Sequence, residues 1–582
     1  MKNFLGPEFA AQIESVKRLN KIVSTDSTES VPDSKRMLLF LGLFIAGILI
    51  LAGRLFTINI LQGSHFRNLA LSNKTRESKI TAPRGIIYDR NRIPLVRNVP
   101  AYTASNDKTT TLEEITREYI YPELAAHVLG FTGQVSQTEL ADLNKLGQKN
   151  LNSIYQPGIT IGKTGVEKSF DLYLRGIDGK ELAEVDAVGK RVRTLGRLEP
   201  VAGQNITLNL DINLTQVAAA AMQGRKGAVL ASVPSSGDIL LLYSSPSFDP
   251  NRFIADQNVA EILARPDQPM FNRVVGGQYP PGSTFKILLA LAGLETGKIS
   301  AEYRVEDTGV LTVGKFSFAN WYFTQYGKRE AVMDIVSALK RSNDIFFYKA
   351  GEAIGINNLA QWIEKAGVLT KFGIDIEGEA AGIMPSPDWL KKEKGQEWYL
   401  GNTYHVAIGQ GDLLATPLQV NAWTNLIASG GKLCRPLIAR SKNKELGIKN
   451  EDCKDLGIKK ENIDLVREGM RQACQPGGTG WPLFEFRIKN QELRIDGIDF
   501  FETKVATGSA ENWVRIPVAC KTGTAEYGNP KGNTHAWFTA FAPINNPQIS
   551  VTVLVEEGGE GSSVAAPIAK KILEEWFENE PL

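Results

Sequence analysis

Cysteine, histidine and net charge are all scarce in this 582-residue chain, and each shortage excludes a class of protein. Four cysteines are too few for a disulfide-dense scaffold. Four histidines, far apart and without a CxxC or HxxxH pattern, give no signature of a zinc site. The 66 Lys and Arg residues nearly balance the 64 Asp and Glu residues, and the net charge of +2 does not support a nucleic-acid-binding surface. We therefore expect no metal, no cofactor and no nucleic-acid partner.

Long apolar runs are also scarce, because one segment alone approaches the length of a membrane span. Residues 37–53 read MLLFLGLFIAGILILAG without a charge, and after a single arginine the apolar character continues to residue 61. A bilayer core requires about 20 apolar residues in a helix, so residues 37–61 are predicted to cross a membrane once. A buried core helix and a cleaved signal peptide are the alternatives. Soluble helices are rarely apolar on every side, and a signal peptide has a shorter leader.

The remaining patterns predict an α+β fold. Short runs of β-branched and apolar residues predict strands, and longer apolar periods predict helices. Strands are expected in a hairpin over 227–245 and at 518–525, 535–542 and 549–555; helices are expected at 283–296, 331–366 and 564–577, with two further helical pieces over 112–146. Strands that are followed by helices and then by strands again argue against a regular βαβ repeat.

The pattern Ser-x-x-Lys occurs five times, so it identifies nothing by itself. One copy has a distinctive context, because Ser283 follows the segment YPPG. The prolines prevent helix before the serine and permit it afterwards. Ser283 is therefore expected in a first helical turn, where free amides and the helix dipole favour negative charge. Lys286 follows on the same helix face.

Lys286 is the only charge in an otherwise apolar helix before Glu295. A buried lysine has a lowered pKa, and a neutral amine near a hydroxyl is a general base. The alternative is a lysine that extends to the surface. Two further triplets, Ser342-Asn343-Asp344 and Lys521-Thr522-Gly523, follow in order. This ordered trio is the motif set of penicillin-binding proteins and serine β-lactamases. The chain contains a second Lys-Thr-Gly triplet at Lys163-Thr164-Gly165, which lies outside this order, and we assign no motif role to it.

With these motifs the chain resembles a class B penicillin-binding protein, closest to the elongation-type penicillin-binding protein 2 group. The segments APRGIIYDRNRIPL, GKTGVEKSFDLYLRG, YPPGSTFK, AIGQGDLLATPLQ, PGGTGW, CKTGTAEYG and HAWFTAFAP occur in family order. The resemblance implies a cytoplasmic tail (1–36), a transmembrane helix (37–61), an elongated β-rich pedestal (62–223) and a transpeptidase domain (224–582). That last domain is expected to have a central antiparallel sheet with flanking helices.

The resemblance also implies a reaction, D,D-transpeptidation of peptidoglycan stem peptides, and a set of catalytic roles. Ser283 attacks the carbonyl between two D-alanines and forms an acyl-enzyme. Lys286 accepts the serine proton, and Ser342 relays protons between Lys286 and Lys521. Asp344 is expected to hydrogen-bond the donor peptide and Lys286.

The remaining implied residues bind the substrate. Lys521, Thr522 and Thr524 are expected to hold its terminal carboxylate. Gly523 leaves room for the substrate backbone along the strand. The backbone N–H groups of Ser283 and Thr524 are expected to form the oxyanion hole, where one donor contributes roughly 100- to 1000-fold in rate.

Three features depart from the family pattern. Asp344 stands where many relatives have Asn, and its charge raises the pKa of Lys286; we interpret it as a mark of the elongation subtype. The head of the pedestal is short, which puts partner contacts through it in doubt. Cys520 is expected to be a buried packing thiol, while two of Cys434, Cys453 and Cys474 are expected to pair in an exported domain.

By the same resemblance the expected partners are stem peptides, β-lactam antibiotics, a SEDS-type glycosyltransferase and other elongation-complex proteins. Lys35 and Arg36 directly precede the span, which places residues 1–36 in the cytoplasm. The chain is then a single-pass protein of the bacterial cytoplasmic membrane, with its catalytic domain on the periplasmic or extracellular side. The alternatives are a D,D-carboxypeptidase, a β-lactamase or a non-catalytic β-lactam-binding scaffold.

Overall fold

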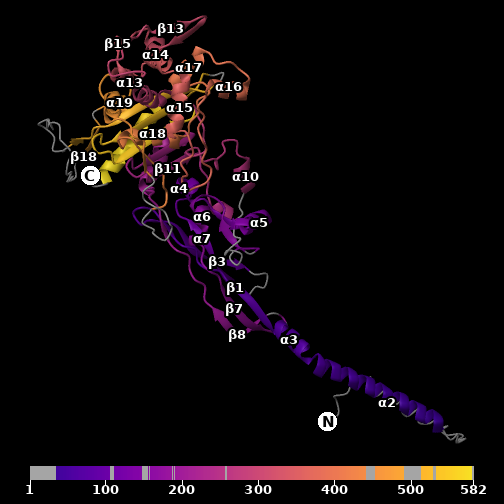
Figure 1. Cartoon of the computed structure of the whole chain (residues 1–582). Coiled ribbons are helices and arrows are strands. Elements are labelled where there is room, and N and C mark those ends of the chain that lie inside the picture. The colour runs from indigo at the N-terminus through magenta and orange to yellow at the C-terminus, as the bar shows by residue number, and fades with distance from the viewer. Residues whose placement is uncertain are drawn as a thin grey trace, which may run out of the picture. The chain divides into compact units, whose positions relative to one another are not determined.

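The computed structural model places most of the chain in helices and strands (Figure 1). The described residues are 34–104, 111–146, 155, 157–186, 188, 190–255, 259–440, 453–484, 486–489, 513–528 and 532–579. Most of the predicted cytoplasmic tail, residues 1–33, lies outside them. The chain divides into two compact units, Met1–Lys79 with Lys180–Leu198, and Ile80–Gly179 with Glu199–Leu582. The boundary expected at residue 223 stays a prediction.

The first unit contains the apolar helix α2, Ser34–Phe56. Its 23 residues rise about 35 Å at 1.5 Å per residue, slightly more than the roughly 30 Å of a bilayer core. The π-helical turn η1 (Thr57–Leu61) and α3 (Gly63–Lys74) continue it. Within the described residues, 35–61 is the only helical stretch long and apolar enough to cross a membrane, and its apolar window is not buried. The same unit holds a sheet in the order β1-β7-β8, formed by Thr75–Ile80, Gly179–Val185 and Arg191–Leu198.

The N-terminal part of the second unit is built on the sheet β4-β3-β2-β9. These strands are Thr111–Tyr119, Pro94–Ala104, Ile87–Tyr88 and Ile206–Thr207. The prediction of two helical pieces over 112–146 is therefore wrong in its first part, because β4 is a strand that pairs with β3 from Val96↔Tyr119 to Ala104↔Thr111. The later part does form helices, α4 (Pro122–Leu129) and α5 (Gln137–Leu146).

A buried cluster of one carboxylate and two guanidinium groups joins separate segments in the N-terminal part of the second unit. Glu167 is fully buried and accepts from Arg84 Nη2 and Arg117 Nε, each at 2.8 Å. Burial disfavours the carboxylate, but the two guanidinium groups outweigh it and lower the pKa of Glu167. Arg84 belongs to the APRG segment and Glu167 to GKTGVEK, so these two family-like segments have a structural reason for their charges.

The rest of the second unit surrounds a central antiparallel sheet, as predicted, and this sheet has five strands in the order β11-β10-β22-β21-β20. Its strands are Ile239–Ser245, Gly227–Ser232, Ile549–Val555, Thr534–Ala542 and Ala519–Glu526. Alternate residues of β10 enter different cores: Ala228 and Leu230 lie in one cluster, Val229 and Ala231 in the other. Since β20 is an edge strand, one side of its backbone is left open for other contacts.

Helices cover both faces of this sheet. One face packs on α8 (Ile212–Met222) and α20 (Ala566–Asn579), and the other packs on α18 (Pro417–Ala428). Further helices contribute to the core that contains Ala228 and Leu230. They are α11 (Lys286–Glu295), α13 (Ile335–Arg341), α14 (Asp344–Ile354), α15 (Ile356–Ala366) and α19 (Lys460–Ala473). Asp211 caps α8 by accepting from the N–H groups of Asn213 and Leu214.

Short elements complete the second unit. They are α6 (Gly165–Ser169), α7 (Asp171–Leu174), α9 (Asn251–Ile254), α10 (Val259–Ala264), α12 (Trp321–Tyr326), α16 (Pro387–Lys394), α17 (Leu400–Ala407), the turns η2 (Gly282–Phe285), η4 (Trp481–Leu483) and η5 (Gly561–Ala565), and the strands β5 (Thr132–Gln134), β6 (Thr160–Gly162), β12 (Val305–Glu306), β13 (Val310–Val313), β14 (Phe316–Ala319), β15 (Val332–Met333), β16 (Lys432–Cys434), β17 (Cys453–Asp455), β18 (Arg487–Lys489) and β19 (Trp513–Arg515). The mixed α and β architecture with a central antiparallel sheet is thus confirmed.

Candidate active site

The predicted nucleophile stands on a tight turn before a buried helix. Ser283 belongs to the 3₁₀ turn η2, and α11 begins three residues later at Lys286. Gly282 has a φ of +55°, which favours glycine, and its N–H donates to the Gly409 carbonyl over 2.9 Å. Ser283 is half-buried, whereas its neighbours on the turn are buried. The turn therefore leaves the serine accessible at the start of the helix.

Lys286 is fully buried, so the alternative of a lysine that extends to the surface is wrong. Its Nζ donates to Asp344 Oδ1 over 2.5 Å, to the Ser342 carbonyl over 2.9 Å and to Ser342 Oγ over 3.3 Å. Burial lowers the pKa of Lys286, and the carboxylate of Asp344 acts in the opposite direction. The charge of Asp344 therefore has the effect on Lys286 that the sequence suggested.

Ser342 occupies the short link between α13 and α14 in a left-handed conformation, with a φ of +52°. Its hydroxyl accepts from Lys521 Nζ over 2.8 Å and from Lys286 Nζ over 3.3 Å. Ser342 itself is only 5% exposed. The second motif therefore joins the lysines of the first and third motifs at a single hydroxyl group.

Lys521 lies on β20 and is also fully buried. Burial and the nearby positive charge of Lys286 lower the pKa of Lys521 well below its usual value, although Asp344 opposes them. Two ammonium groups around one hydroxyl repel each other in a poorly solvated site. The arrangement therefore favours a state in which one of the two amines is neutral and able to accept a proton.

The hydroxyls of the third motif have separate partners. Thr522 is almost buried, and its Oγ1 donates to Thr479 Oγ1 over 2.8 Å. Thr524 is exposed, and its Oγ1 accepts from the Gly561 N–H over 3.4 Å. The strand thus carries one hydroxyl held by Thr479 and one at the surface.

Gly523 allows the nucleophile turn to approach β20. A Cβ at this position would lie 3.0 Å from Trp537 Cβ and 3.1 Å from both the Pro281 carbonyl oxygen and Thr284 Cγ2. Such contacts are tighter than nine in ten real Cβ contacts, so a side chain there would push the turn or Trp537 away by a few tenths of an ångström. This is a second reason for glycine, in addition to room for a substrate backbone.

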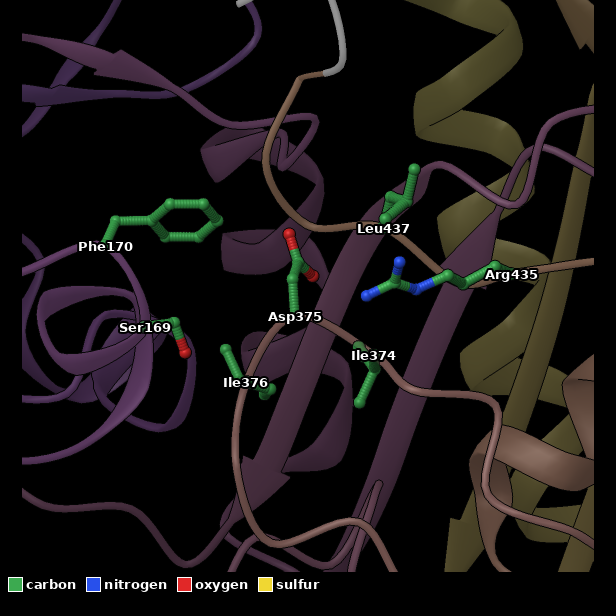
Figure 2. Close-up of a pocket in the computed structure, with 7 residues that line it drawn as sticks. All are labelled: Ser169, Phe170, Ile374, Asp375, Ile376, Arg435 and Leu437. Atoms are coloured by element: carbon green, nitrogen blue, oxygen red, sulfur yellow. The ribbon is translucent and has the colours of Figure 1, made fainter. Parts of the chain in front are cut away.

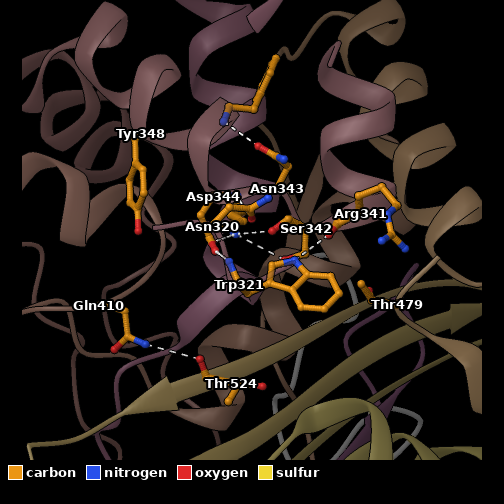
Figure 3. Close-up of polar contacts among 12 residues, drawn as sticks. Asn320, Trp321, Arg341, Ser342, Asn343, Asp344, Tyr348, Gln410, Thr479 and Thr524 are labelled. Atoms are coloured by element: carbon orange, nitrogen blue, oxygen red, sulfur yellow. Dashed lines mark hydrogen bonds and ion pairs between the residues drawn. The ribbon is translucent and has the colours of Figure 1, made fainter. Parts of the chain in front are cut away.

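Sequence reasoning missed residues that contact the motifs from other segments. The Trp321 N–H donates to Asp344 Oδ2 over 2.9 Å, and its indole N–H donates to the Arg341 carbonyl over 2.9 Å. Figure 3 shows Trp321 and Asp344 close together beside Ser342. Thr479 lies in the PGGTGW segment, which the sequence singled out without assigning a role to its threonine.

All four cysteines are paired. Cys434 bonds Cys453 between β16 and β17, so the expected pairing within that group is confirmed. Cys474, which follows α19, bonds Cys520 on β20. The expectation that Cys520 is a packing thiol is therefore wrong, because the end of α19 brings Cys474 against it. This second disulfide lies one residue from Lys521.

One cavity of the second unit lies away from these motifs. It has a volume of about 390 Å³ and is lined by Ser169, Phe170, Ile374, Asp375, Ile376, Arg435 and Leu437 (Figure 2). The Asp375 carboxylate in it already accepts from the N–H groups of Ile438 and Ala439, each at 2.7 Å. Among the described residues, no group of three His, Cys, Asp or Glu side chains is placed to hold a metal ion. The candidate chemistry therefore stays at the three motifs.

Comparison with known proteins gives the class to which this fold and site belong. Residues 227–574 match the family "Penicillin binding protein transpeptidase domain", and residues 106–208 match "Penicillin-binding Protein dimerisation domain". The first match covers more than half of the chain. The chain therefore belongs to the penicillin-binding proteins and is a transpeptidase of that family.

Individual relatives narrow the group. The chain is 29% identical to the peptidoglycan D,D-transpeptidase MrdA of Acinetobacter baumannii over 93% of this chain and 87% of the relative. It is 32% identical to Pseudomonas aeruginosa penicillin-binding protein 2 in complex with WCK 5153 (TM-score 0.67, 87% of this chain and 100% of that chain). Helicobacter pylori penicillin-binding protein 2 in complex with MreC is 26% identical (TM-score 0.70, 87% and 99%). Within its family the chain thus falls in the penicillin-binding protein 2 group of peptidoglycan transpeptidases, as its motifs predicted.

Proposed function

We propose that this chain cross-links peptidoglycan stem peptides during cell elongation through an acyl-enzyme on Ser283. One observation carries the proposal: a single hydroxyl, that of Ser342, accepts from the Nζ atoms of two fully buried lysines. One of these lysines, Lys286, follows Ser283 by one helical turn. Such a cluster can take a proton from a serine and return it to a leaving amine.

The proposed reaction has two steps. Ser283 Oγ bonds to the carbonyl carbon of the penultimate D-Ala, and its proton moves to the neutral amine of Lys286. The bond to the terminal D-Ala then breaks, and its amine receives a proton through Ser342 and Lys521. In the second step an acceptor amine attacks the ester carbonyl carbon and gives up a proton to Lys521 through Ser342. The ester bond to Ser283 Oγ breaks, and this oxygen takes back the proton from Lys286, which forms the cross-link and frees Ser283.

Other groups of the chain would orient the substrate and stabilise charge. The N–H groups of Ser283 and Thr524 are suited to the oxyanion, because Thr524 lies on the strand that packs against the nucleophile turn. Lys521, Thr522 and Thr524 would bind the terminal carboxylate. A β-lactam offers the same amide and carboxylate, so it should acylate the same serine.

Mass spectrometry of the protein after incubation with a labelled penicillin tests the proposal. We expect one adduct, on Ser283, and no adduct with Ser283→Ala. Ser429→Ala is the matched control, because Ser429 precedes Lys432 in the same Ser-x-x-Lys spacing but lies in another part of the domain. Release of D-alanine with formation of cross-linked product should depend on Ser283 in the same way.

An adduct elsewhere, or labelling that survives Ser283→Ala, would refute Ser283 as the nucleophile. Rapid hydrolysis of the adduct would instead identify a β-lactamase or carboxypeptidase.

The proposal includes a location for the protein. The apolar helix α2 supports a place for the chain in the cytoplasmic membrane, with the catalytic domain on the outer side of that membrane.

We also propose that the chain works with a SEDS-type glycosyltransferase and with elongation proteins. The solved relative in complex with MreC supports this class of partner. The proposed contacts are the membrane helix and the pedestal. Co-purification that survives deletion of residues 1–220 would count against them.

A further inference from the structure

Behind the second motif lies a buried carboxylate that the proposed mechanism does not use. Asp307 follows β12 and is 3% exposed. Its oxygens accept four hydrogen bonds, from Gly309 N–H (2.8 Å), Asn320 Nδ2 (2.9 Å), Glu330 N–H (2.9 Å) and Asn343 Nδ2 (3.0 Å). All four donors are neutral, and no Lys, Arg or His of the described chain forms an ion pair with this group. A buried charge is costly unless such donors are fixed around it.

These hydrogen bonds fix the orientation of two amide side chains. Because Asp307 accepts from the amino groups of Asn320 and Asn343, the carbonyl oxygens of both amides point elsewhere. Asn320 Oδ1 accepts from the Asp344 N–H over 3.1 Å, and Asn343 Oδ1 accepts from the Phe346 N–H over 2.9 Å. Asn343 thereby caps α14, whose first residue is Asp344.

Asp344 connects this network to the reacting groups. Its Oδ1 accepts from Lys286 Nζ over 2.5 Å, and its Oδ2 accepts from the N–H of Trp321, the neighbour of Asn320. Asn320 therefore holds the Asp344 backbone, and the next residue holds its carboxylate (Figure 3). Both contacts come from one segment that Asp307 anchors.

We propose that Asp307 is a positioning residue of the transpeptidase: through Asn320 and Asn343 it fixes the second motif so that Asp344 holds Lys286. The proposal rests on the function given above. A loop that shifted by 1 Å would lengthen the Asp344–Lys286 contact, and misplacement on this scale can cost about 100-fold in rate. The charged groups that face Lys286 are Asp344 and Lys521, and Asp307 acts on it only through the amides.

Asp307→Asn tests this role, because it replaces an acceptor of four hydrogen bonds by a group of the same shape with its own N–H donors. We expect the second-order rate of acylation by a fluorescent penicillin to fall by about 10- to 100-fold, less than loss of a general base. The acid limb of the pH–rate profile should also move to lower pH. A loosely held Asp344 stabilises the Lys286 ammonium less, so Lys286 loses its proton at lower pH.

Asp375→Asn is the matched control. Asp375 is also a carboxylate that accepts from backbone N–H groups, those of Ile438 and Ala439, but it lies by the cavity of Figure 2. Both variants should lower the unfolding temperature, and only Asp307→Asn should change the acylation rate and its pH profile. A wild-type rate and profile for Asp307→Asn would overturn the inference.

Asn320→Ala is a second variant, which tests the inference by itself if Asp307→Asn fails to fold and combines with Asp307→Asn if both fold. It removes one link and should lower the acylation rate with the same shift of the acid limb. In the double variant the two losses should be less than additive, because both act through the same contact to Asp344. Full additivity, or an unshifted limb in both variants, would refute the route through Asn320. Failure of wild-type Ser283 to label would refute the proposed function instead, so the two outcomes are distinguishable.

Discussion

Ser342 lies at the centre of the site because its hydroxyl can both accept and donate a hydrogen bond. In the observed geometry it accepts from Lys521 at 2.8 Å, while Lys286 lies at 3.3 Å. When Lys286 is a neutral amine, it can accept a proton from the same hydroxyl. The hydroxyl of Ser342 is therefore suited to relay a proton between two lysines whose positive charges repel each other.

Asp344→Asn should change the pH dependence of acylation in a defined direction. The carboxylate raises the pKa of Lys286 against the effect of burial, so its removal lets the pKa fall further. Lys286 is then neutral at lower pH, and the acid limb of the acylation rate moves to lower pH. The rate at the optimum should fall about 10-fold, the value of one charge-assisted hydrogen bond of roughly 1.5 kcal/mol.

Asp334→Asn is the control for this shift. Asp334 caps α13 through the Ser337 N–H over 2.8 Å, a role that Asn can retain, and it lies outside the lysine cluster. Stopped-flow acylation between pH 5 and pH 9 would record both profiles. An acid limb that stayed in place or moved to higher pH would show that Asp344 does not set the charge of Lys286.

At the scale of single residues, the sequence predicted the three motifs and the burial of Lys286, because apolar neighbours in one helix determine that burial. It did not predict Asp307, Asn320 or Thr479. Their contacts join segments far apart in the chain, and an isolated Asp or Asn is equally common in turns. Local pattern carries no information on which distant amide a carboxylate will meet.

At the scale of elements, the disulfide Cys474–Cys520 ties the end of α19 to the strand of the third motif. It closes a separation of 46 residues, for which the chain-entropy estimate is about 4 kcal/mol. Replacing both cysteines by serine should therefore lower the free energy of unfolding by about 3 to 4 kcal/mol in urea denaturation. Because Cys520 adjoins Lys521, and Thr479 lies five residues after Cys474, acylation should also slow by about 10-fold.

The pair Cys434–Cys453 provides the comparison. Its separation of 19 residues gives a stabilisation of similar size, about 3 kcal/mol, but it joins β16 and β17 away from the motifs. Its double serine variant should lose stability and keep its acylation rate. Equal acylation rates in both double variants would mean that the disulfide on β20 has no role in the site.

The sequence predicted strands correctly where the segment is buried along its length. It predicted the wrong element where pairing with a distant strand determines whether the segment forms a helix or a strand. The strands β20, β21 and β22 are buried along most of their length, and the expected strands were confirmed to within one residue at each end. The segment TLEEITREY has a helix-like composition, yet it forms β4 because β3 pairs along its whole length. A partner strand supplied by another segment overrides local preference.

At the scale of the whole molecule, the apolar helix α2 and the residues of the candidate active site belong to different compact units. All residues placed in the site, from Ser283 to Thr524, fall in the second unit, and α2 falls in the first. Phe40 and Ile50 of α2 are 70% and 72% exposed, and such a continuous apolar surface is stable only in lipid or detergent. Anchoring and catalysis should therefore be separable.

Deletion of residues 1–61 tests this separation. The shortened chain should move from the detergent phase to the aqueous phase in a phase-partitioning assay, because the apolar helix is gone. Its rate of acylation by penicillin should stay within about threefold of the full chain, since Ser283, Lys286, Ser342 and Lys521 keep their packing around the five-stranded sheet.

A full chain with Leu41→Lys and Leu49→Lys is the matched comparison, because two charges at the centre of a span cost roughly 5 to 7 kcal/mol on insertion scales. It should also leave the membrane while it retains acylation. A shortened chain that stayed with detergent would show that another surface binds lipid, and a large loss of acylation would show that the anchor supports the catalytic unit.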